Sequence, residues 1–270
     1  MNISVLMSVY FKESPVFLKE AIDSILQQTV KADEIVCIKD GKLTKELDSL
    51  LDKYDEENPG LFKFIVFEEN KGLGNALRNG VEACSNEIIA RMDTDDIALP
   101  TRFEKQFTRM KENDLDIVGS NILEFDGSVD NILSERKVPS TYEMIKAYAK
   151  KRNPFNHMTV MYKKSAVLKA GNYKDFLWFE DYNLWVRMIL NGAKMYNIQE
   201  DLVYARTGKS MFGRRGGLEY IKREYKMQKN MKELKFISNF EFCKNIIARS
   251  VIRLIPNSLR EIIYLKVLRG

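Results

Sequence analysis

The chain has 270 residues, of which 45% are hydrophobic and 30% charged, a composition that is ordinary for a globular protein and does not suggest disorder. This length allows one large α/β domain with an appended piece, or two small domains. Three widely spaced cysteines, Cys37, Cys84 and Cys243, show no metal-ligand pattern and are odd in number, which fits a reducing compartment.

The net charge of +5 hides an asymmetry between the two ends of the chain. Residues 206–270 carry 16 Lys/Arg against 5 Glu, whereas residues 1–205 carry 27 basic and 33 acidic side chains. An acidic body with a basic tail indicates that the tail meets an anionic surface, either membrane phospholipid or nucleic acid. The N-terminus lacks a basic start, and no window approaches 18 apolar residues, so we expect neither a signal peptide nor a transmembrane span.

Strands alternate with helices over the first third of the chain. Alternating β-forming residues predict a strand over 2–9, and apolar positions at helical spacing predict a helix from Ser14-Pro15 to about Gln27. Further strands are expected at 34–38, 61–67 and 87–92, with helices at about 43–56 and from the loop 70–74 to about Ala83. This order predicts βαβ units and a mostly parallel sheet, with the positions after strands one, two and four along one edge.

The middle of the chain continues this alternation less regularly. We expect a helix at about 100–112, a strand at 117–123, an irregular stretch over 125–156 with a helix near 141–150, a strand at 159–162 and a short helix at 164–170. A further helix opens at Phe179, and short strands around 194–198 and 201–205 precede a loop over 206–217.

From about Leu218 the sequence predicts helices only: one to about Lys235, one over 240–253 and a last one after Pro256. Basic residues punctuate the apolar positions of the last two. Such basic amphipathic helices are typical of segments that lie in a membrane interface, so we expect membrane contact rather than nucleic acid. The alternative is a helical hairpin that packs on the sheet domain and keeps its charges in solvent.

The stretch at residues 88–96 carries the main functional signal, because an apolar run ends there in Asp93, Asp95 and Asp96. Several carboxylates in a partly dry cleft are unfavourable unless a cation compensates them. Mg²⁺ is usually held by one or two carboxylates plus substrate phosphates, and α/β sheets bind ligands beyond the carboxyl ends of their strands. We therefore predict a metal–diphosphate site. The alternative is a solvated acidic turn that caps the next helix.

Several motifs stand in an order that resembles the family 2 inverting glycosyltransferases. They are Ser8-Val9-Tyr10 with Glu13, Ser24 to Thr29, Asp40-Gly41, Asn70 to Gly80, Asp93 to Asp96, and Glu180 to Arg187. The resemblance covers roughly 1–205 and implies the GT-A fold, an α/β fold with a mostly parallel mixed sheet flanked by helices. It implies a catalytic domain over 1–217 and a basic helical tail over 218–270, similar to the tails of capsule and O-antigen assembly enzymes.

The resemblance also implies a nucleotide site. By family position, Asp40 accepts a hydrogen bond from the imide N–H of uracil or thymine, and Tyr10 stacks on or flanks the base. Here Lys39 and Lys42 surround Asp40-Gly41, where the family often has Asp-Asp-Gly-Ser. The remaining residues assigned to the nucleotide are Glu13, Arg78, Asp93 and Thr94. Arg78 has an alternative role as a surface partner of Glu82.

Mn²⁺ or Mg²⁺ is the implied cofactor. Asp95 is expected as the direct metal ligand, with Asp93 on a ribose hydroxyl and sharing the ion. Asp96 either supports these ligands or is the N-cap of the helix that is expected to begin at about Pro100. The metal would neutralise the diphosphate leaving group.

Glu180 and Asp181 are assigned the remaining chemistry. Inversion needs one carboxylate to deprotonate the acceptor hydroxyl as it attacks the anomeric carbon, and no covalent enzyme intermediate forms. By family position Asp181 is this base, and Glu180 positions the acceptor or the base. The alternative is a pair of N-terminal acids that serve the helix dipole.

Four residues are candidates for acceptor or diphosphate contacts. His157 could line the acceptor pocket, or be a structural histidine. Trp178, followed by Phe179, could offer a sugar ring an apolar face, or pack in the core. Arg206 and Lys209 belong to a glycine-rich loop whose cations would suit closure over a diphosphate, or contact with lipid phosphate.

We therefore predict an inverting glycosyltransferase that moves a sugar from a nucleotide diphosphate, most plausibly UDP, to a hydroxyl of a lipid-linked saccharide in surface-polysaccharide synthesis. Its expected location is the cytoplasmic face of the cell membrane. One rival is a sugar-phosphate nucleotidyltransferase, which would want a basic glycine-rich loop straight after the first strand; residues 10–15 are not one. The other is a non-catalytic membrane- or nucleic-acid-binding module, which leaves the acids at 93–96 and 180–181 unexplained.

Overall fold

The computed structural model describes residues 2–207 and 217–254. Its strands are β1 (Ile3–Val9), β2 (Glu34–Lys39), β3 (Phe62–Val66), β4 (Ile88–Arg91), β5 (Ile97–Ala98), β6 (Ile117–Asp126), β7 (Ser128–Arg136), β8 (Met161–Lys163) and β9 (Met195–Arg206). Its helices are α1 (Pro15–Leu26), α2 (Lys45–Glu57), α3 (Leu73–Ala83), α4 (Arg102–Asn113), α5 (Tyr142–Ala149), the 3₁₀ helix η1 (His157–Thr159), α6 (Lys164–Lys169), α7 (Glu180–Leu190), α9 (Leu218–Glu233) and α10 (Asn239–Leu254).

One mixed sheet organises the molecule, with strand order β3-β2-β1-β4-β8-β6-β9-β5 and with β7 paired to β6. Pairing is parallel between β3, β2, β1 and β4 and between β6 and β9. It is antiparallel where β8 joins β4 to β6, where β5 meets β9 and where β7 meets β6. The predicted βαβ units are therefore confirmed, and strands β2, β1 and β4 end side by side.

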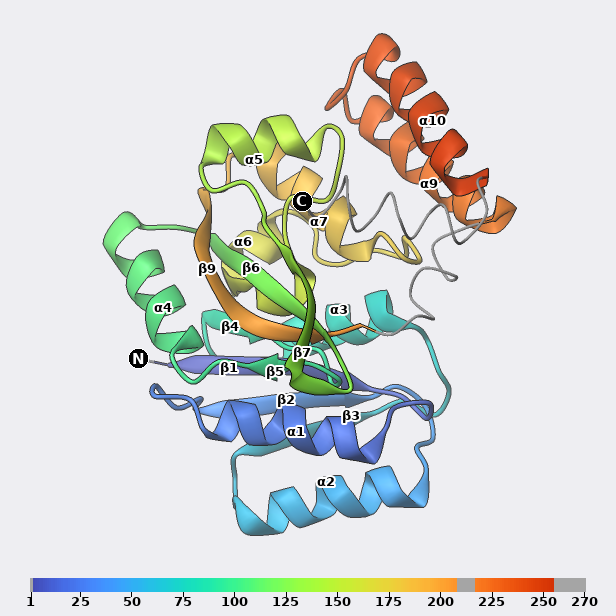
Figure 1. Ribbon diagram of the computed structural model, residues 1–270. Coiled ribbons are helices and arrows are strands. Elements are labelled where there is room, and N and C mark those ends of the chain that lie inside the picture. The colour runs from blue at the N-terminus through green and yellow to red at the C-terminus, as the bar shows by residue number, and fades with distance from the viewer. Residues whose placement is uncertain (1, 208–216, 255–270) are drawn as a thin grey trace.

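Helices cover both faces of this sheet (Figure 1). Side chains alternate along β1, so Leu6 joins the core under α3 and α7, whereas Val5 and Met7 join the core under α1, α2 and α4. Both faces of the central strands are thus buried, as is usual for parallel sheets. This arrangement leaves the ends of the strands, and the loops that follow them, as the accessible edge.

Strands β7 and β9 differ from the sequence expectation. Strand β7 occupies part of the stretch that we expected to be irregular, and most of its residues are exposed on an edge, so the stretch lacks a buried alternating pattern. The two short strands expected around 194–198 and 201–205 form the single strand β9. The register to β6 jumps from Ile198 to Asp201, which is a bulge at the place where we expected a break.

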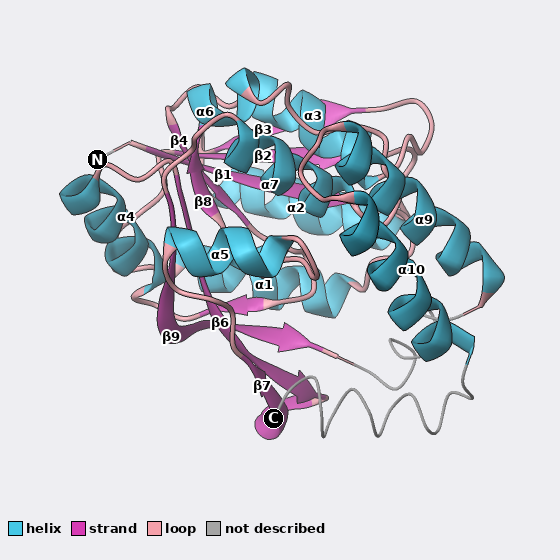
Figure 2. Cartoon of the chain, turned by 90° about the horizontal axis from the view of Figure 1, so that it is seen from above, coloured by secondary structure: helices cyan, strands magenta, loops and turns pink. Residues whose placement is uncertain are grey.

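The helices α9 and α10 run side by side at one edge of the molecule (Figure 2). Met227 and Met231 of α9 are fully buried in the same core as Trp185 of α7. Asn183 of α7 also donates to Asn230 of α9 at 2.8 Å. The described part of the tail therefore has the arrangement of a hairpin packed on the sheet domain.

None of the described helices is long and apolar enough to cross a membrane. The helix expected after Pro256 lies outside the described residues, as does Lys209.

Candidate active site

The three parallel strands β2, β1 and β4 bring the predicted site residues to one edge of the sheet. Val9 at the end of β1 pairs with Lys39 at the end of β2, and Leu6 of β1 pairs with Arg91 at the end of β4. The residues that follow these strands, Tyr10, Asp40 and Asp93, are consequently neighbours along this edge. The topology thus confirms the edge on which the sequence placed them.

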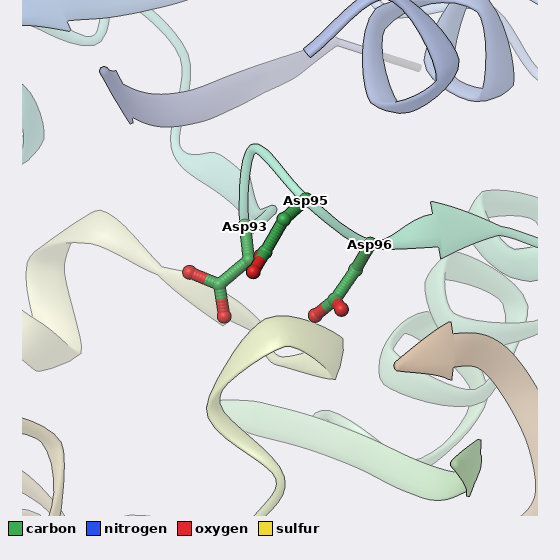
Figure 3. A group of neighbouring side chains, drawn as sticks. All are labelled: Asp93, Asp95 and Asp96. Atoms are coloured by element: carbon green, nitrogen blue, oxygen red, sulfur yellow. The ribbon is translucent and has the colours of Figure 1, made fainter. Parts of the chain in front are cut away.

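The acidic turn, which we define as Asp93, Asp95 and Asp96, connects β4 to β5. One carboxylate oxygen from each residue lies within 4.8 Å of the other two, and Figure 3 shows the three side chains gathered on one side of the turn. Asp96 is only 2% exposed. Its Oδ1 accepts the backbone N–H of Arg206 at 2.7 Å, and its Oδ2 has no hydrogen-bond partner among the described residues.

The electrostatics of the acidic turn disfavour three negative charges. Burial, reinforced by Asp93 and Glu13, raises the pKa of Asp95 to about 7. Burial, with Asp95 and Asp93 adding repulsion, raises the pKa of Asp96 well above its ordinary value. The positive charge around the acidic turn is therefore too small to stabilise all three of its carboxylates in the ionised form.

Two buried arginines lie beside the end of β4. Arg91 is 2% exposed and forms an ion pair with Asp93. Its Nε and Nη1 have no partner within the part of the chain that the structure describes. On the other face of the sheet, Arg102 is fully buried and donates to the backbone oxygen of Arg91 at 2.6 Å. Burial, with Arg91 adding repulsion, lowers the pKa of Arg102 to about 9.

The residues of the acidic turn fit a divalent cation. They offer clustered, hard oxygen ligands, which Mg²⁺ and Mn²⁺ favour, and the buried Oδ2 of Asp96 lacks a donor. Arg91 pairs with one carboxylate of the three, and no ion pair to Asp95 or Asp96 is present among the described residues. A bound cation would relieve the repulsion that raises the pKa of these two acids.

Asp40 holds the loop between β3 and α3. It is 3% exposed, and its two carboxylate oxygens accept the backbone N–H groups of Lys71 at 2.7 Å and Gly72 at 3.0 Å. Gly41 allows the loop to approach, because a Cβ at this position would lie 2.7 Å from the backbone nitrogen of Asn70. Each oxygen of Asp40 keeps a second lone pair for a further donor such as a base imide.

The other residues assigned to the nucleotide lie at two places. Tyr10 is 37% exposed after β1, and Glu13 accepts the hydroxyl of Thr94 at 2.6 Å, which ties the loop after β1 to the acidic turn. Arg78 is exposed on α3, with its Nε 3.8 Å from Glu82. Arg78 is thus in the surface arrangement that we gave as its alternative role.

Glu180 and Asp181 open α7, where the helix N-terminus favours negative charge. Asp181 accepts hydrogen bonds from the Asn153 side chain at 2.5 Å and from the Tyr182 backbone at 2.7 Å. Burial nevertheless raises the pKa of Asp181, and it raises the pKa of Glu180 to about 7. Glu180 can therefore hold or release a proton near neutral pH, and burial makes the carboxylate of Asp181 more basic than that of a free aspartate.

A close contact joins the acids of α7 to the loop that Asp40 holds. A Cβ at Gly74 would lie 2.9 Å from Cγ of Glu180 and 3.0 Å from the backbone oxygen of Lys174. The helix α3 thus packs directly against the start of α7. The position of Glu180 depends on the absence of a side chain at Gly74.

The remaining predicted residues have different surroundings. His157 lies 3.0 Å from the hydroxyl of Tyr173, and burial with the nearby charge of Arg91 keeps its pKa well below the ordinary value. Trp178 is 46% exposed. Arg206 donates to the backbone oxygens of Asp95 and Gly127 and pairs with Glu20, so its guanidinium connects the acidic turn to the β6–β7 turn and to α1.

Sequence reasoning assigned no role to Arg91. A charged residue inside an apolar strand just before three acids was an available signal, because buried arginines are almost always paired. In the structure Arg91 pairs with Asp93, and its positive charge offsets part of the rise that burial causes in the pKa of Asp181. The charge of Arg91 therefore acts on both groups of acids.

The chain resembles known glycosyltransferases in sequence. Residues 4–177 match the family model described as Glycosyl transferase family 2. The UDP-Gal:alpha-D-GlcNAc-diphosphoundecaprenol beta-1,3-galactosyltransferase of Escherichia coli is 40% identical over 267 residues, which cover 98% of this chain and 96% of that protein. The amylovoran biosynthesis glycosyltransferase AmsE of Erwinia amylovora is 36% identical over 271 residues, with 99% of each chain covered.

Solved structures show the same fold. S. aureus TarS 1-349 in complex with UDP-GlcNAc has a TM-score of 0.67 at 17% identity, over 99% of this chain and 76% of that one. The mannosyltransferase PcManGT of Pyrobaculum calidifontis, in complex with GDP-Man and Mn²⁺, has a TM-score of 0.65 at 14% identity, over 96% and 71%. The GT-A fold inferred from the sequence is confirmed, and the chain belongs to glycosyltransferase family 2.

Proposed function

We propose that this glycosyltransferase moves a sugar, with inversion, from a UDP-sugar to a hydroxyl of a lipid-linked saccharide. The observation that carries the proposal is the acidic turn, which gathers three carboxylates beside Asp40 at the edge of the sheet, while Glu180 and Asp181 open α7. The acidic turn suits a cation and its diphosphate, and the pair Glu180–Asp181 suits the removal of a proton from the acceptor. A transfer between two substrates needs both at one site.

The donor half of this proposal rests on Asp40, Tyr10 and the acidic turn. Asp40 retains acceptor capacity at the end of β2, and the exposed ring of Tyr10 stands beside it after β1. A UDP-sugar is favoured because the E. coli relative is named for UDP-Gal and the TarS structure holds UDP-GlcNAc.

Asp95 and Asp93 would hold Mn²⁺ or Mg²⁺, with Asp96 beside them. When bound, the cation supplies positive charge that stabilises the diphosphate leaving group. Mn²⁺ is supported by the PcManGT complex, whose fold is shared. Arg91 orients Asp93, since it forms an ion pair with this carboxylate.

Asp181 is the proposed base. Its Oδ2 takes a hydrogen bond from Asn153 and its Oδ1 one from the Tyr182 amide, so the carboxylate is held in one orientation. It removes the proton of the acceptor hydroxyl during attack on the anomeric carbon. Glu180, whose pKa is raised to about 7, stays close enough to neutral to donate a hydrogen bond to the acceptor.

A lipid-linked acceptor is supported by the diphosphoundecaprenol in the name of the E. coli relative. The hairpin of α9 and α10 carries exposed apolar residues, Leu218, Phe240 and Ile247, among basic ones, and we propose that it contacts anionic lipid at the cytoplasmic face of the membrane. Sedimentation with anionic and with neutral vesicles tests this part. Equal binding to both vesicle types would contradict it.

The activity is tested by incubating the protein with UDP-, dTDP- and GDP-sugars and Mn²⁺ and measuring release of the nucleoside diphosphate, with EDTA as the metal-free arm. Alkyl-diphospho-monosaccharides serve as acceptors. We expect release from a UDP-sugar that is stimulated by an acceptor and abolished by EDTA. Absence of both release and nucleotide binding for every donor would reject the proposal.

A further inference from the structure

The loop before α7 is held along one face of α9. Tyr220, Arg223 and Lys226 lie three residues apart on this helix and therefore share a face. The ring of Tyr220 stacks on that of Trp178, with 5.4 Å between centroids and 22° between planes. The guanidinium of Arg223 lies 4.7 Å from the Trp178 ring, and the amine of Lys226 lies 5.1 Å from the Phe176 ring. The indole of Trp178 is thus fixed in one plane.

The backbone at Trp178 has a φ of +73°, a conformation that bulky side chains rarely adopt. The strain belongs to a tight turn, in which the backbone N–H of Phe179 donates to the oxygen of Phe176 at 2.6 Å. The turn also directs the Trp178 amide toward Glu180, since this amide lowers the pKa of that acid. Strained backbone of this kind is concentrated at functional sites.

Despite these contacts, 46% of Trp178 remains exposed. The other tryptophan of the chain, Trp185, is fully buried. Trp178 stands three residues before Asp181 in the sequence, on the turn that leads into α7. A rigid, open indole on the turn that leads to the proposed base is suited to the apolar C–H face of a pyranose ring, because a flat aromatic surface gains contact area without loss of rotamer freedom.

We infer that Trp178 is the platform on which a sugar ring of the acceptor lies, with Tyr220 and Arg223 as positioning residues that hold the indole in place. The inference rests on the proposed function, because it assigns the acceptor side of the same site. It makes α9 part of acceptor recognition, although α9 follows the region that matches the family model. The ligand class is a saccharide, and the interaction is stacking without a covalent step.

A membrane role for this ring is the less suitable interpretation. A tryptophan at a lipid interface needs only an apolar body and an exposed N–H. It requires neither a strained backbone nor a plane fixed by stacking on Tyr220. Vesicles therefore form one arm of the test.

Kinetics provide the first test. Trp178→Gly relieves the positive φ while removing the ring, and Trp178→Phe keeps an aromatic platform. With an alkyl-diphospho-monosaccharide that the wild type uses, we expect Trp178→Gly to raise the acceptor KM about tenfold, with the UDP affinity unchanged and with partial rescue by Trp178→Phe. Tyr225→Ala is the matched control, because Tyr225 is 47% exposed on the same helix and packs edge-on against Phe242.

Fluorescence provides the second test. Iodide quenches exposed indoles, so in the wild type it should act on Trp178 and spare the buried Trp185. We expect the alkyl-diphospho-monosaccharide to protect Trp178 from iodide, and the alkyl diphosphate without the sugar to give no protection. Trp178→Phe should remove the iodide-sensitive signal and its protection together.

The outcomes separate this inference from the proposed function. If no acceptor stimulates transfer, the proposed function fails and the inference fails with it. If transfer occurs and Trp178→Gly leaves the acceptor KM unchanged, the inference alone is overturned. Protection by the sugar-free alkyl diphosphate or by phosphatidylglycerol vesicles would make Trp178 a lipid contact, and protection by UDP alone would assign it to the donor; either result also overturns the inference.

Discussion

The two groups of acids in this protein are built in different ways. The acidic turn has three carboxylates in four residues, an orphaned oxygen on Asp96 and an arginine ion pair at Asp93. The pair Glu180–Asp181 sits at a helix N-terminus, where each oxygen of Asp181 already accepts a hydrogen bond. Burial raises the pKa of carboxylates in both groups. They differ in that the acidic turn has an oxygen without a donor among the described residues, whereas both oxygens of Asp181 are held by hydrogen bonds.

This difference distinguishes a site for a cation from a site for a proton. A cation needs several oxygens that have no other donors, whereas a base needs one carboxylate in a fixed orientation. Arg91 lies within reach of both groups. Each variant below affects one side of this comparison and should leave a measurable property of the other side intact.

The largest expected effect is that of Asp181→Asn. The amide keeps the shape of the side chain but cannot accept the acceptor proton, so transfer should fall by about 10²–10⁴-fold. UDP binding and its dependence on Mn²⁺ should stay at the wild-type level. Asp175→Asn, at an exposed acid of the same loop, is the control. Normal transfer by Asp181→Asn would remove Asp181 as the base.

Arg91→Met should have the largest effect on stability. Removing one partner of a buried ion pair leaves an uncompensated charge, and we expect a loss of about 3 kcal/mol in the free energy of unfolding, measured by urea denaturation. Arg78→Met is the matched control, because Arg78 and Glu82 are both more than half exposed and such pairs contribute about 0–1 kcal/mol. Equal losses in both variants would contradict the pairing role of Arg91.

The pH dependence of stability should reveal the cation site. Burial raises the pKa of Asp95 from its ordinary value of 3.8 to about 7 in the folded protein, so the native state binds more protons than the unfolded state between these values. The melting temperature of the cation-free protein should therefore fall as the pH rises from about 4 to about 7. Mn²⁺ should raise it more at pH 8 than at pH 5, because only ionised carboxylates bind the metal.

Asp95→Asn gives the control for this pH experiment. It removes the acid that titrates while it keeps the size of the side chain, so both the fall with pH and the effect of Mn²⁺ should shrink. A melting temperature that rises over the same pH range in the cation-free wild type would show that the turn is already compensated.

The smallest expected effect belongs to Gly74→Ala, which tests the contact between the two sides of the site. The added methyl would meet Cγ of Glu180 and the backbone oxygen of Lys174, so the start of α7 must shift slightly. We expect transfer to fall about tenfold through misplacement of the acids, with the free energy of unfolding changed by less than about 1 kcal/mol. Asn75→Ala, at the next residue of α3, is the control. Gly60→Ala would be an unsuitable control, because Gly60 has a positive φ that alanine rarely adopts.

The parts of the fold that the sequence predicted are those specified by local periodicity. Strands β1 to β4 and their helices follow alternating or helical patterns of apolar residues, and their bounds agree with the structure within two residues. Strand β7 could not be found in this way, since its exposed residues show no buried face. The bulge of β9 at residues 199–200 depends on its pairing with β6, which is a tertiary property.

The candidate site shows the same division. The acids at 93–96 and 180–181 are visible as residue types, and the strand order places the first group beside Asp40. The partners of these acids come from distant segments: Asn153 for Asp181, and the backbone of Arg206 for Asp96. Such contacts depend on packing, and no local pattern indicates them.

The contacts of Arg206 have a consequence for the order of folding. Its backbone meets Asp96 across 110 residues, and its side chain meets Glu20 across 186. Contacts between such distant positions form slowly, because the intervening chain must first lose entropy. During synthesis, strands β1 to β4 can pair before β9 has been made. The acidic turn therefore acquires its final shape only in the last stage of folding, once the end of β9 docks against it.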